Sequence, residues 1–338
     1  MKIVTVENKK EWDNLLFQCK NVNLLQTWEY GEAKKNAEGW LPIRSVLLYE
    51  DKPIGVIQTL TKKVPLLGVI ARINRAPLII VSDNKSCHEL TIQILKFLHN
   101  YWVGQKKVIL FIAPNIAQGE INDGILQESG YNRINKEAWT SITIDLCPDE
   151  TTLRKALYQK WRNVLNKSEK MGLELEIDNS DDGLSFLMSK YKQMMDGKGF
   201  SGPSEKLIRE IKNATANKLY IQVMFAVKNG VRVGGILVFG CVGTCLYLVG
   251  WNSPEGRISQ SNYFLLWQAI LTFKKMGYHW FDLGGINEES TPGITHFKRG
   301  LGGKEYALIG EFEAFPKGIL SLLAKKVIKL GLKYRICE

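Results

Sequence analysis

The sequence predicts two similar α+β domains packed side by side. The chain has 338 residues, which is about twice the usual length of one domain. Strand patterns alternate with helical periodicity in both halves. Two short patterns also recur: the turn and strand at 53–57 resemble those at 232–236, and the helix and strand that end at Phe111 resemble those that end at Phe281. Such repetition is typical of a duplicated domain.

The first half contains the elements of one such domain. A helix begins at Trp28 after a polar loop. Alternating or continuous apolar residues predict strands, and apolar residues at helical spacing predict a further helix. The predicted strands lie at 44–49, 54–59, 69–73, 78–81, 108–113 and 140–146, and the further helix at 89–102. Cys147 and Pro148 then interrupt the pattern, so we place the domain boundary there and assign residues 1–146 to the first domain.

The second half repeats this plan over residues 147–307. Asp149 or Thr151 can cap a helix that ends at Gly172. The predicted helices lie at 153–170, 184–195, 204–213 and 263–276, and the predicted strands at 221–227, 233–240, 244–250 and 280–283. We expect the C-terminal segment 308–338 to pack on the first domain.

The composition is that of a globular protein in a reducing compartment. Hydrophobic residues make up 45% of the chain and charged residues 23%, which argues against disorder. The net charge of +11 suggests an anionic partner. The six cysteines form no dense framework, the N-terminus is polar, and no apolar stretch approaches about eighteen residues. We therefore expect a cytoplasmic monomer, and we predict neither a metal site nor a cofactor.

The densest candidate site follows the strand at 280–283. Gly284 and Gly285 allow the backbone to approach a ligand without interference from a Cβ atom. A basic pair, Lys298 and Arg299, then follows the aromatic residue Phe297. Paired glycines alone usually mark just a turn, but this grouping predicts a site for an anion or a carbonyl group.

Three stretches resemble the Fem-type (FemABX) aminoacyltransferases, which build peptidoglycan cross-bridges from aminoacyl-tRNA. The most specific combines Phe-Asp-Leu-Gly-Gly-Ile at 281–286, Gly-Ile at 293–294, Phe-Lys at 297–298 and a glycine-rich tail that ends near 311. The others are Trp-Glu-Tyr-Gly-Glu-Ala-Lys at 28–34 and the basic stretch 157–173. The resemblance covers roughly residues 25–315. No long heptad run is present, so the chain looks like the compact form of the family, without a coiled-coil insertion.

The resemblance implies two GNAT-like (acetyltransferase-like) domains and a tRNA-dependent aminoacyltransferase. The donor would be aminoacyl-tRNA, and the acceptor an amine of a peptidoglycan precursor, either lipid II or UDP-MurNAc-pentapeptide. Lys298 matches the lysine that would stabilise the oxyanion formed when the ester is attacked; alternatively it is a solvated loop lysine. Asp282 could orient the amine or accept its proton, or it could be a structural hydrogen-bonding residue.

Lys34 and Lys35 lie where the family places a basic residue that holds the phosphates of the acceptor. The spacing to Trp40 leaves open which of the two has this role, and both could instead be lysines on a helix surface. The family's second phosphate-binding arginine is expected before a proline in the second domain. This sequence has no arginine there and reads Phe-Ser-Gly-Pro at 200–203.

Further residues of the second domain could line an acceptor channel. In a GNAT-like sheet two strands diverge into a cleft, although aromatic residues at a strand end can also be rim packing. The candidate substrate-binding residues there are Tyr247, Trp251, Asn252, Arg257, Asn262 and Tyr263, together with Gly284, Gly285 and Arg299.

The predicted helix at 153–170 is strongly basic. Its candidate tRNA-binding residues are Arg154, Lys160, Arg162, Lys167 and Lys170. Such a face can bind RNA phosphates by shape and backbone, or it can simply be solvated.

The tail at 316–335 has apolar residues at helical spacing and six basic residues without an acidic one. A basic amphipathic helix can lie on an anionic membrane, which would place the enzyme near a lipid-linked acceptor. The alternative is a helix packed on the first domain.

Two other classes of function stay open. An N-acyltransferase that uses acyl-CoA or another donor, in polysaccharide or natural-product synthesis, could have the same fold. The turn at 253–262 lacks the glycine pattern that would bind pyrophosphate at a helix start. A non-catalytic RNA- or membrane-binding protein would need neither the glycine pair nor Lys298.

Overall fold

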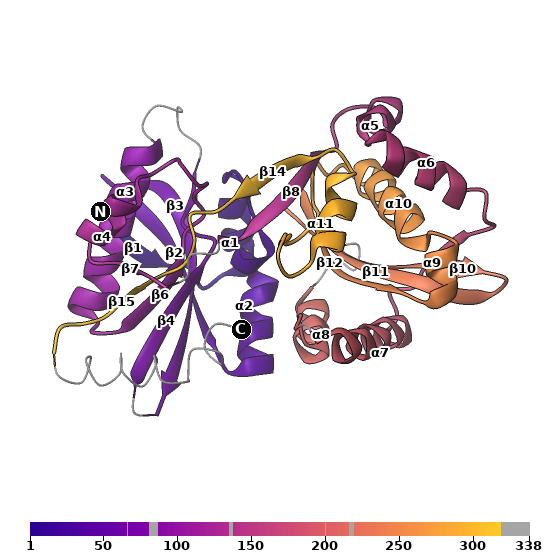
Figure 1. The fold of residues 1–338 in the computed structure, drawn as a ribbon. Coiled ribbons are helices and arrows are strands. Elements are labelled where there is room, and N and C mark those ends of the chain that lie inside the picture. Colours follow the sequence, from indigo (N-terminus) through magenta and orange to yellow (C-terminus); the bar gives the residue numbers. More distant parts are fainter. Residues whose placement is uncertain (66, 81–86, 135–137, 200, 216–219, 319–338) are drawn as a thin grey trace. The chain divides into compact units, whose positions relative to one another are not determined.

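The computed structural model describes residues 1–65, 67–80, 87–134, 138–199, 201–215 and 220–318 (Figure 1). The chain forms two compact units. The first comprises Met1–Asn21, Leu25–Ala138 and the segment from Leu308 onward, and the second comprises Val22–Leu24 and Trp139–Ala307. Most of the amphipathic tail predicted at 316–335 lies outside the described residues.

The first unit has a mixed sheet with the strand order β1-β2-β3-β4-β6-β15-β7, and β5 pairs with β3. The strands are β1 (Lys2–Thr5), β2 (Leu41–Tyr49), β3 (Lys52–Val64), β4 (Gly68–Asn74), β5 (Leu78–Ile79), β6 (Ile109–Ala113), β7 (Asn132–Arg133) and β15 (Phe312–Ala314). β4 and β6 are parallel, because the chain between them includes a helix, and the other pairs are antiparallel.

Helices cover both faces of this sheet. They are α1 (Lys9–Leu16), the short 3₁₀ turn η1 (Leu24–Gln26), α2 (Trp28–Glu38), α3 (Cys87–His99) with its π-helical extension η2 (Asn100–Gln105), and α4 (Asp123–Glu128). Figure 1 shows α1 and α2 on one face and α3 and α4 on the other. The start of α2 is fixed by Thr27, whose side chain accepts a hydrogen bond from the amide of Tyr30, and its end by Gly39 in the left-handed conformation.

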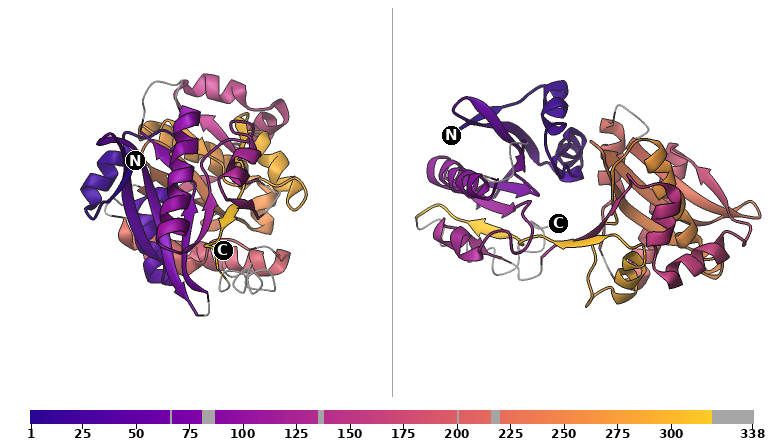
Figure 2. Two further views of the ribbon diagram at one scale, coloured as in Figure 1. Left: turned by 90° about the vertical axis from the view of Figure 1, so that its left-hand side faces the viewer. Right: turned by 90° about the horizontal axis from the view of Figure 1, so that it is seen from above.

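The second unit repeats the architecture with the strand order β14-β8-β13-β12-β11-β10-β9. The strands are β8 (Thr140–Asp145), β9 (Glu174–Ile177), β10 (Ile221–Lys228), β11 (Val231–Cys241), β12 (Thr244–Asn252), β13 (Trp280–Asp282) and β14 (Lys304–Ala307). The helices are α5 (Glu150–Ala156), α6 (Gln159–Ser168), α7 (Asp181–Lys198), α8 (Glu205–Ala214), α9 (Pro254–Ile258), α10 (Ser261–Lys275) and α11 (Pro292–Arg299). Figures 1 and 2 show α10 on one face of this sheet and α7 and α8 on the other.

The core of the second unit lies between α10, α6 and the sheet. Trp267 and Phe273 of α10 pack with Phe281 of β13, and all three side chains are at most 1% exposed. Because Phe281 is anchored in this core, the residues that follow it have a fixed position at the edge of the core.

The first sheet includes a strand from the C-terminal segment, and the second sheet includes the strand that directly follows the first unit in the sequence. In the first sheet β15, from the C-terminal segment, lies between β6 and β7. In the second sheet β8, which follows the first unit in the sequence, lies between β13 and β14. This corrects the expected placement of the strand at 140–146 in the first domain. Local strand patterns identify β8 but contain no information about its partner strand.

Candidate functional site

Lys298 lies near the end of α11 and is buried, with 7% of the residue exposed. Its Nζ donates a hydrogen bond to the carbonyl oxygen of Gly285 at 2.7 Å and lies 5.5 Å from the centre of the Tyr247 ring. Burial lowers the pKa of the Lys298 ammonium to about 8, and the Asp282 carboxylate opposes this effect. Among the described residues Gly285 is the acceptor found for Nζ, so two further N–H donors are available to a ligand.

The glycine pair supplies the turn on which Lys298 is anchored. Gly284 has a φ of +72°, and a Cβ atom on it would lie 2.7 Å from the backbone oxygen of Tyr247. A Cβ atom on Gly285 would lie 2.8 Å from the ring of Trp139. Neither position therefore accommodates a side chain without a shift of its neighbours.

Asp282 is held by three donors in the second unit. The Ser141 hydroxyl lies 2.5 Å from Oδ1, the amide of Gly284 donates to the same oxygen at 2.8 Å, and the Tyr306 hydroxyl donates to Oδ2 at 2.8 Å. These bonds join β8, β13 and β14 beside the glycine turn. This geometry favours a structural, positioning role for Asp282 over direct proton transfer.

The strand β13 ends next to Lys298, whereas its neighbour β12 continues. β12 pairs with β13 only over Thr244–Leu246, but it continues to Asn252. Opposite β11 the register shifts between the pairs Leu237–Val249 and Val238–Tyr247, so β12 contains a bulge at this point. Tyr247 is the first residue beyond the pairing with β13, and burial raises the pKa of its hydroxyl. Lys298, Tyr247 and the glycine turn thus meet where β13 ends beside the bulged strand β12.

An aromatic cluster positions α11 from the other side. The rings of Trp161, Tyr263 and Phe297 lie with their centres 4.8–6.0 Å apart. They come from α6, α10 and α11, and Phe297 directly precedes Lys298. Tyr263 is therefore part of the packing that fixes the catalytic candidate, rather than an open channel wall. Beside it, Asn262 has a buried Oδ1 atom without a hydrogen-bond partner among the described residues.

The end of β12 and the following corner contain three more predicted residues. Trp251 is buried and packs edge-to-face on Phe186. Asn252 accepts a hydrogen bond from the hydroxyl of Ser261 at 2.7 Å through Oδ1. Arg257, on the short helix α9, is exposed.

Arg299 points away from the anion site that the sequence suggests. Its guanidinium pairs with Glu288 at 2.5 Å and with Glu305 at 2.8 Å, and these carboxylates raise its pKa. A cation with two carboxylate partners is poorly suited to bind a further anion, so its geometry favours a role in closing the loop around α11.

The basic helix predicted at 153–170 is two helices. Leu157 is extended (φ −58°, ψ 137°) and separates α5 from α6. The amide of Tyr158 donates to the carbonyl oxygen of Gly300 at 2.9 Å, and a Cβ atom on Gly302 would lie 2.1 Å from the oxygen of Ala156. The helix breaks because its backbone packs against the glycine-rich segment after α11, which no local pattern reveals.

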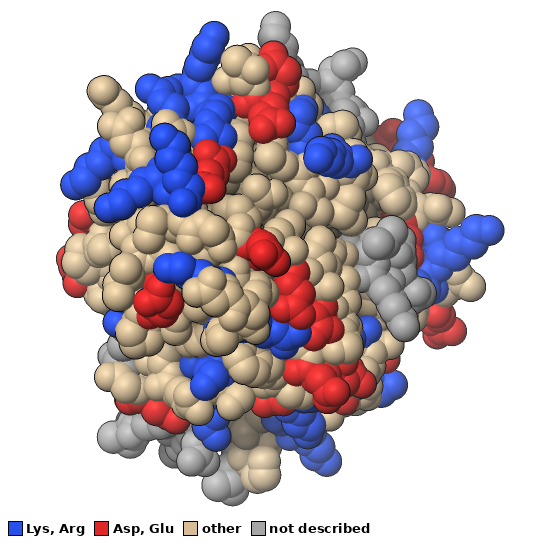
Figure 3. Space-filling view, turned by 90° about the vertical axis from the view of Figure 1, so that its right-hand side faces the viewer, with Lys and Arg blue, Asp and Glu red and all other residues tan. Residues whose placement is uncertain are grey.

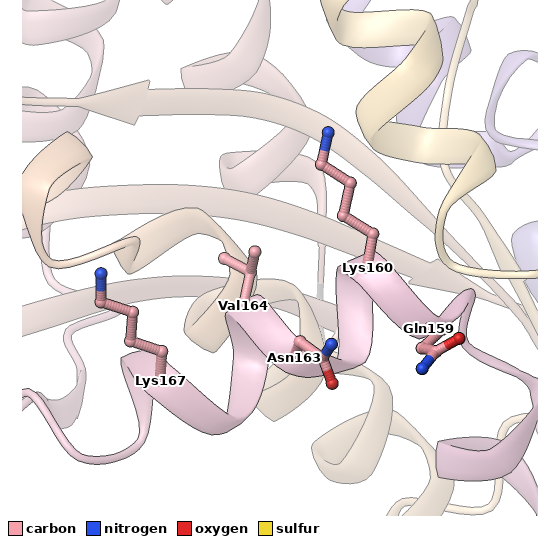
Figure 4. Close-up of a pocket in the computed structure, with 5 residues that line it drawn as sticks. All are labelled: Gln159, Lys160, Asn163, Val164 and Lys167. Carbon is pink, nitrogen blue, oxygen red and sulfur yellow. The ribbon is translucent and has the colours of Figure 1, made fainter.

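The predicted tRNA-binding residues fall into two groups. Arg154 pairs with Glu169 at 2.5 Å and Arg162 donates to the carbonyl oxygen of Lys155, so both have intramolecular partners. Lys160, Lys167 and Lys170 are exposed. Lys160 and Lys167 extend to the same side of α6, with Val164 between them, along a shallow depression (Figure 4). Figure 3 shows blue side chains gathered at the top of this face of the molecule, over α5 and α6.

Lys34 and Lys35 lie on α2 in the first unit and have different surroundings. Lys34 is buried and pairs with Glu38, whereas Lys35 is half exposed and lies 3.8 Å from Glu32. Burial lowers the pKa of the Lys34 ammonium, Glu38 opposes this effect, and the positive charges of Arg72 and Lys62 add smaller lowering contributions. The Lys62 ammonium also donates a hydrogen bond to the carbonyl oxygen of Glu38 at 2.8 Å. The neighbouring cations Lys62 and Arg72 thus distinguish Lys34 from Lys35.

The residues Trp139, Ser141 and Tyr306 also belong to the surroundings of Lys298, and the sequence patterns do not predict them. Trp139 and Ser141 lie far from the Phe-Lys segment in the sequence, and Tyr306 lies within the glycine-rich tail but in none of the predicted motifs. The pairing of β8 with β13 and β14 brings them together. Within the described ranges, no group of acidic, histidine and cysteine side chains suits a metal ion. No helix in these ranges is long and apolar enough to span a membrane.

Comparison with known proteins identifies the fold. Residues 153–299 match the family model of the acetyltransferase (GNAT) domain. The whole structure is similar to the crystal structure of FemX, with a TM-score of 0.78 at 17% sequence identity, over 98% of this chain and 100% of that chain. No curated protein matches the sequence significantly.

Two further solved structures share the architecture at lower similarity. One is the C-terminal domain of a putative lysylphosphatidylglycerol synthetase from Agrobacterium fabrum (TM-score 0.53, 13% identity, 94% of this chain and 95% of that chain). The other is a tandem GNAT protein from the clavulanic acid biosynthesis pathway (TM-score 0.52, 11% identity, 94% of this chain and 99% of that chain). The predictions of two tandem GNAT-like domains and of a structural resemblance to the Fem-type proteins are therefore confirmed.

Proposed function

We propose that this chain, which has an acyltransferase fold, transfers an amino acid from aminoacyl-tRNA to an amine of a peptidoglycan precursor. The observation that carries the proposal is the buried Lys298 ammonium, anchored to Gly285 where β13 ends beside β12. The structural similarity to FemX supports the choice of donor and acceptor class.

The chemistry needs little more than positioning and one stabilising charge. The neutral amine of the acceptor attacks the ester carbonyl of the donor, and negative charge develops on the carbonyl oxygen. The remaining N–H donors of Lys298 stabilise this oxyanion in a site shielded from water. A C–N bond then forms as the C–O ester bond breaks, and the proton lost by the amine ends on the leaving ribose hydroxyl. The reaction therefore consumes no net proton and requires no cofactor.

In the first unit, the cluster of Lys34, Lys62 and Arg72 is suited to the phosphates of the acceptor. An added anion would offset the burial and the charges of Arg72 and Lys62 that lower the pKa of Lys34, and this would favour its ammonium form. Arg72 also contacts Asn74 and Glu311, so its guanidinium is held in place. The cluster provides an alternative to the arginine that the sequence lacks at 200–203.

In the second unit, the exposed lysines of α6 are suited to the phosphates of the donor RNA. Lys160, Lys167 and Lys170 have no carboxylate partner among the described residues, whereas Arg154 is neutralised by Glu169. We assign RNA contact to the lysines and a structural role to Arg154.

The decisive experiment combines purified protein with total tRNA charged with labelled amino acids and with UDP-MurNAc-pentapeptide or lipid II. We expect label on the muropeptide, sensitive to RNase, and a loss of transfer in Lys298→Ala. Lys304→Ala is the matched control, because Lys304 is an exposed lysine of the same segment. Transfer that survives RNase treatment, or activity that Lys298→Ala leaves intact, would contradict the proposal.

A second candidate is an N-acyltransferase that uses acyl-CoA, favoured by the match of residues 153–299 to the acetyltransferase model. Turnover of acetyl-CoA with an amine acceptor, in the absence of any reaction with charged tRNA, would establish this alternative.

A further inference from the structure

A second pocket of the same unit, of about 390 Å³, lies between the C-terminal half of α7 and the corner where β12 leads into α9. The helix contributes Lys190, Gln193 and Met194, and the corner contributes Trp251, Asn252 and Arg257. Its volume is at the lower end of the range of about 300–1,000 Å³ that is usual for ligand sites. It therefore suits one group of nucleotide size rather than a long chain.

The pocket has an uncompensated positive charge. Lys190 and Arg257 line it from opposite sides, and no acidic residue is among the described residues that line it. The nearest acidic residue along α9, Glu255, is engaged by Lys228 at 2.6 Å. In the part of the chain that the structure describes, neither Lys190 nor Arg257 forms an ion pair. A phosphate group bound between them would gain charge-assisted hydrogen bonds without displacing an existing partner.

The remaining wall combines apolar side chains with two amides, those of Gln193 and Asn252. Trp251 is held edge-to-face on Phe186 at 5.7 Å between ring centres, and Met194 adds an adaptable apolar surface. Asn252 uses its Oδ1 atom to accept a hydrogen bond from Ser261, so its amide N–H groups are the atoms left to donate to a ligand. The two cations match the phosphate of a nucleotide. The aromatic-lined wall with its amide donor matches the base.

We propose that this pocket binds a nucleotide, with its phosphate between Lys190 and Arg257 and its base against Trp251 and Met194. The proposal rests on the proposed function, which supplies two possible sources of this nucleotide. The nucleotide is either the 3′-terminal nucleotide of the donor RNA or the uridine nucleotide of a UDP-linked acceptor. Both offer the same phosphate and base chemistry, so binding experiments must separate them.

The test is a titration of the full-length protein that is monitored by isothermal titration calorimetry. The ligands are AMP, CMP, the trinucleotide CCA, UMP, UDP and inorganic pyrophosphate. We expect Arg257→Gln to weaken nucleotide binding by about tenfold or more, the usual effect of losing a hydrogen bond to a charged group, and Lys190→Gln to weaken it as well. Lys192→Gln is the matched control, because Lys192 is exposed on the same helix and does not line the pocket. Thermal unfolding of each variant shows whether the fold is retained.

Tighter binding of AMP, CMP or CCA would assign the pocket to the donor, and tighter binding of UMP or UDP would assign it to the acceptor. The proposal is overturned if no nucleotide binds up to about 10 mM, if Arg257→Gln and Lys192→Gln bind equally well, or if pyrophosphate binds as tightly as the nucleotides. Binding is measured without transfer, so nucleotide binding in a protein that fails to transfer an amino acid would contradict only the proposed function. If Arg257→Gln transfers the amino acid with unchanged affinities for the donor and the acceptor, only the proposal for the pocket is contradicted.

Discussion

The ammonium of Lys298 donates to the carbonyl oxygen of Gly285 at 2.7 Å, across a glycine turn into which no side chain fits. This hydrogen bond to a backbone oxygen holds the ammonium in place. Among the described residues, no carboxylate forms an ion pair with it. Asp282, the nearest acidic group acting on it, is occupied by Ser141, Gly284 and Tyr306. The charge of Lys298 is therefore available to a substrate.

Replacing Lys298 should abolish most of the transfer activity without unfolding the protein. Lys298→Met removes the charge but keeps most of the buried side chain, and the loss of an oxyanion donor is expected to lower kcat by about 10²–10³. Single-turnover transfer from charged tRNA measures this effect, with Lys304→Met as the control. A variant with near-normal kcat would show that the cation does not act on the reacting carbonyl.

The pH dependence of activity and of stability should run in opposite directions above pH 8. Transfer requires the ammonium form of Lys298, whereas the attacking amine must be neutral. The wild-type rate divided by the rate of Lys298→Met at the same pH should therefore fall as pH rises through the pKa of about 8 of Lys298 in the folded protein. The pKa in the unfolded chain is near its ordinary value of 10.5, so the unfolded state binds more protons between pH 8 and 10.5. The contribution of Lys298 to stability is therefore unfavourable below pH 8 and becomes less so as pH rises through this window.

Single-turnover rates corrected for ester hydrolysis, and denaturant midpoints at each pH, measure the two trends. In Lys298→Met, the part of the rise in stability above pH 8 that comes from Lys298 should disappear. A ratio of the wild-type rate to the Lys298→Met rate that stays constant from pH 7 to pH 9 would rule out the lowered pKa as a determinant of activity.

The two glycines should respond differently to a change at Trp139. Gly285→Ala places a Cβ atom against the indole of Trp139, and such overpacking costs about 1–3 kcal/mol of unfolding free energy. In a Trp139→Ala background this cost should fall by half or more. Gly284→Ala adds a left-handed alanine and a contact with the Tyr247 backbone oxygen, and Trp139→Ala should not relieve it. Equilibrium unfolding of the double-mutant cycle tests both statements.

Lys34 and Lys35 form a natural matched pair for the acceptor site. Lys34→Ala should raise KM for a phosphate-bearing acceptor by about tenfold, since its ammonium belongs to the cluster with Lys62 and Arg72. Lys35→Ala, at the half-exposed neighbour, should change KM less than twofold. The kinetics should be measured with a phosphate-free acceptor peptide as well, because a difference that persists there would be structural rather than a phosphate contact.

The lysines of α6 should account for part of the salt dependence of tRNA binding. In Lys160→Gln with Lys167→Gln, the slope of the logarithm of affinity against the logarithm of salt concentration should decrease by about 0.7–0.9 for each lysine that no longer binds a phosphate. Lys192→Gln with Lys206→Gln removes the same charge from exposed positions on α7 and α8 and should leave the slope nearly unchanged. Equal slopes in both double variants would remove α6 from the RNA interface.

Local sequence patterns were sufficient for most elements but not for their long-range partners. Periodicity predicts the hairpin of β10 and β11, and its turn at Asn229 and Gly230 has the positive φ angles expected there. The break at Leu157 and the neutralisation of Arg299 by Glu288 and Glu305 depend on contacts with the glycine-rich segment and the loops around α11. A residue's tertiary partners do not appear in its local pattern, so these features required the structure.

The candidate site divides in the same way. The grouping of the Gly-Gly turn with Lys298 predicts a site for an anion or a carbonyl group, and the oxyanion role of Lys298 is implied by the resemblance to the Fem-type family. The hydrogen bonds that hold the Asp282 carboxylate were not predicted, because its partners Ser141 and Tyr306 come from strands whose pairing is non-local. The different burial of Lys34 and Lys35 likewise follows from how α2 packs on its sheet.

The position of the C-terminal strand β15 in the first sheet has a consequence for biogenesis. During synthesis, residues up to Ala138 leave the ribosome well before Phe312–Ala314, so β6 and β7 must wait for the strand that joins them. A fragment that ends near residue 140 would expose these unpaired edges, which invite association with other chains. The two halves are therefore not separable modules, and a split between them should yield soluble protein only when both pieces are produced together.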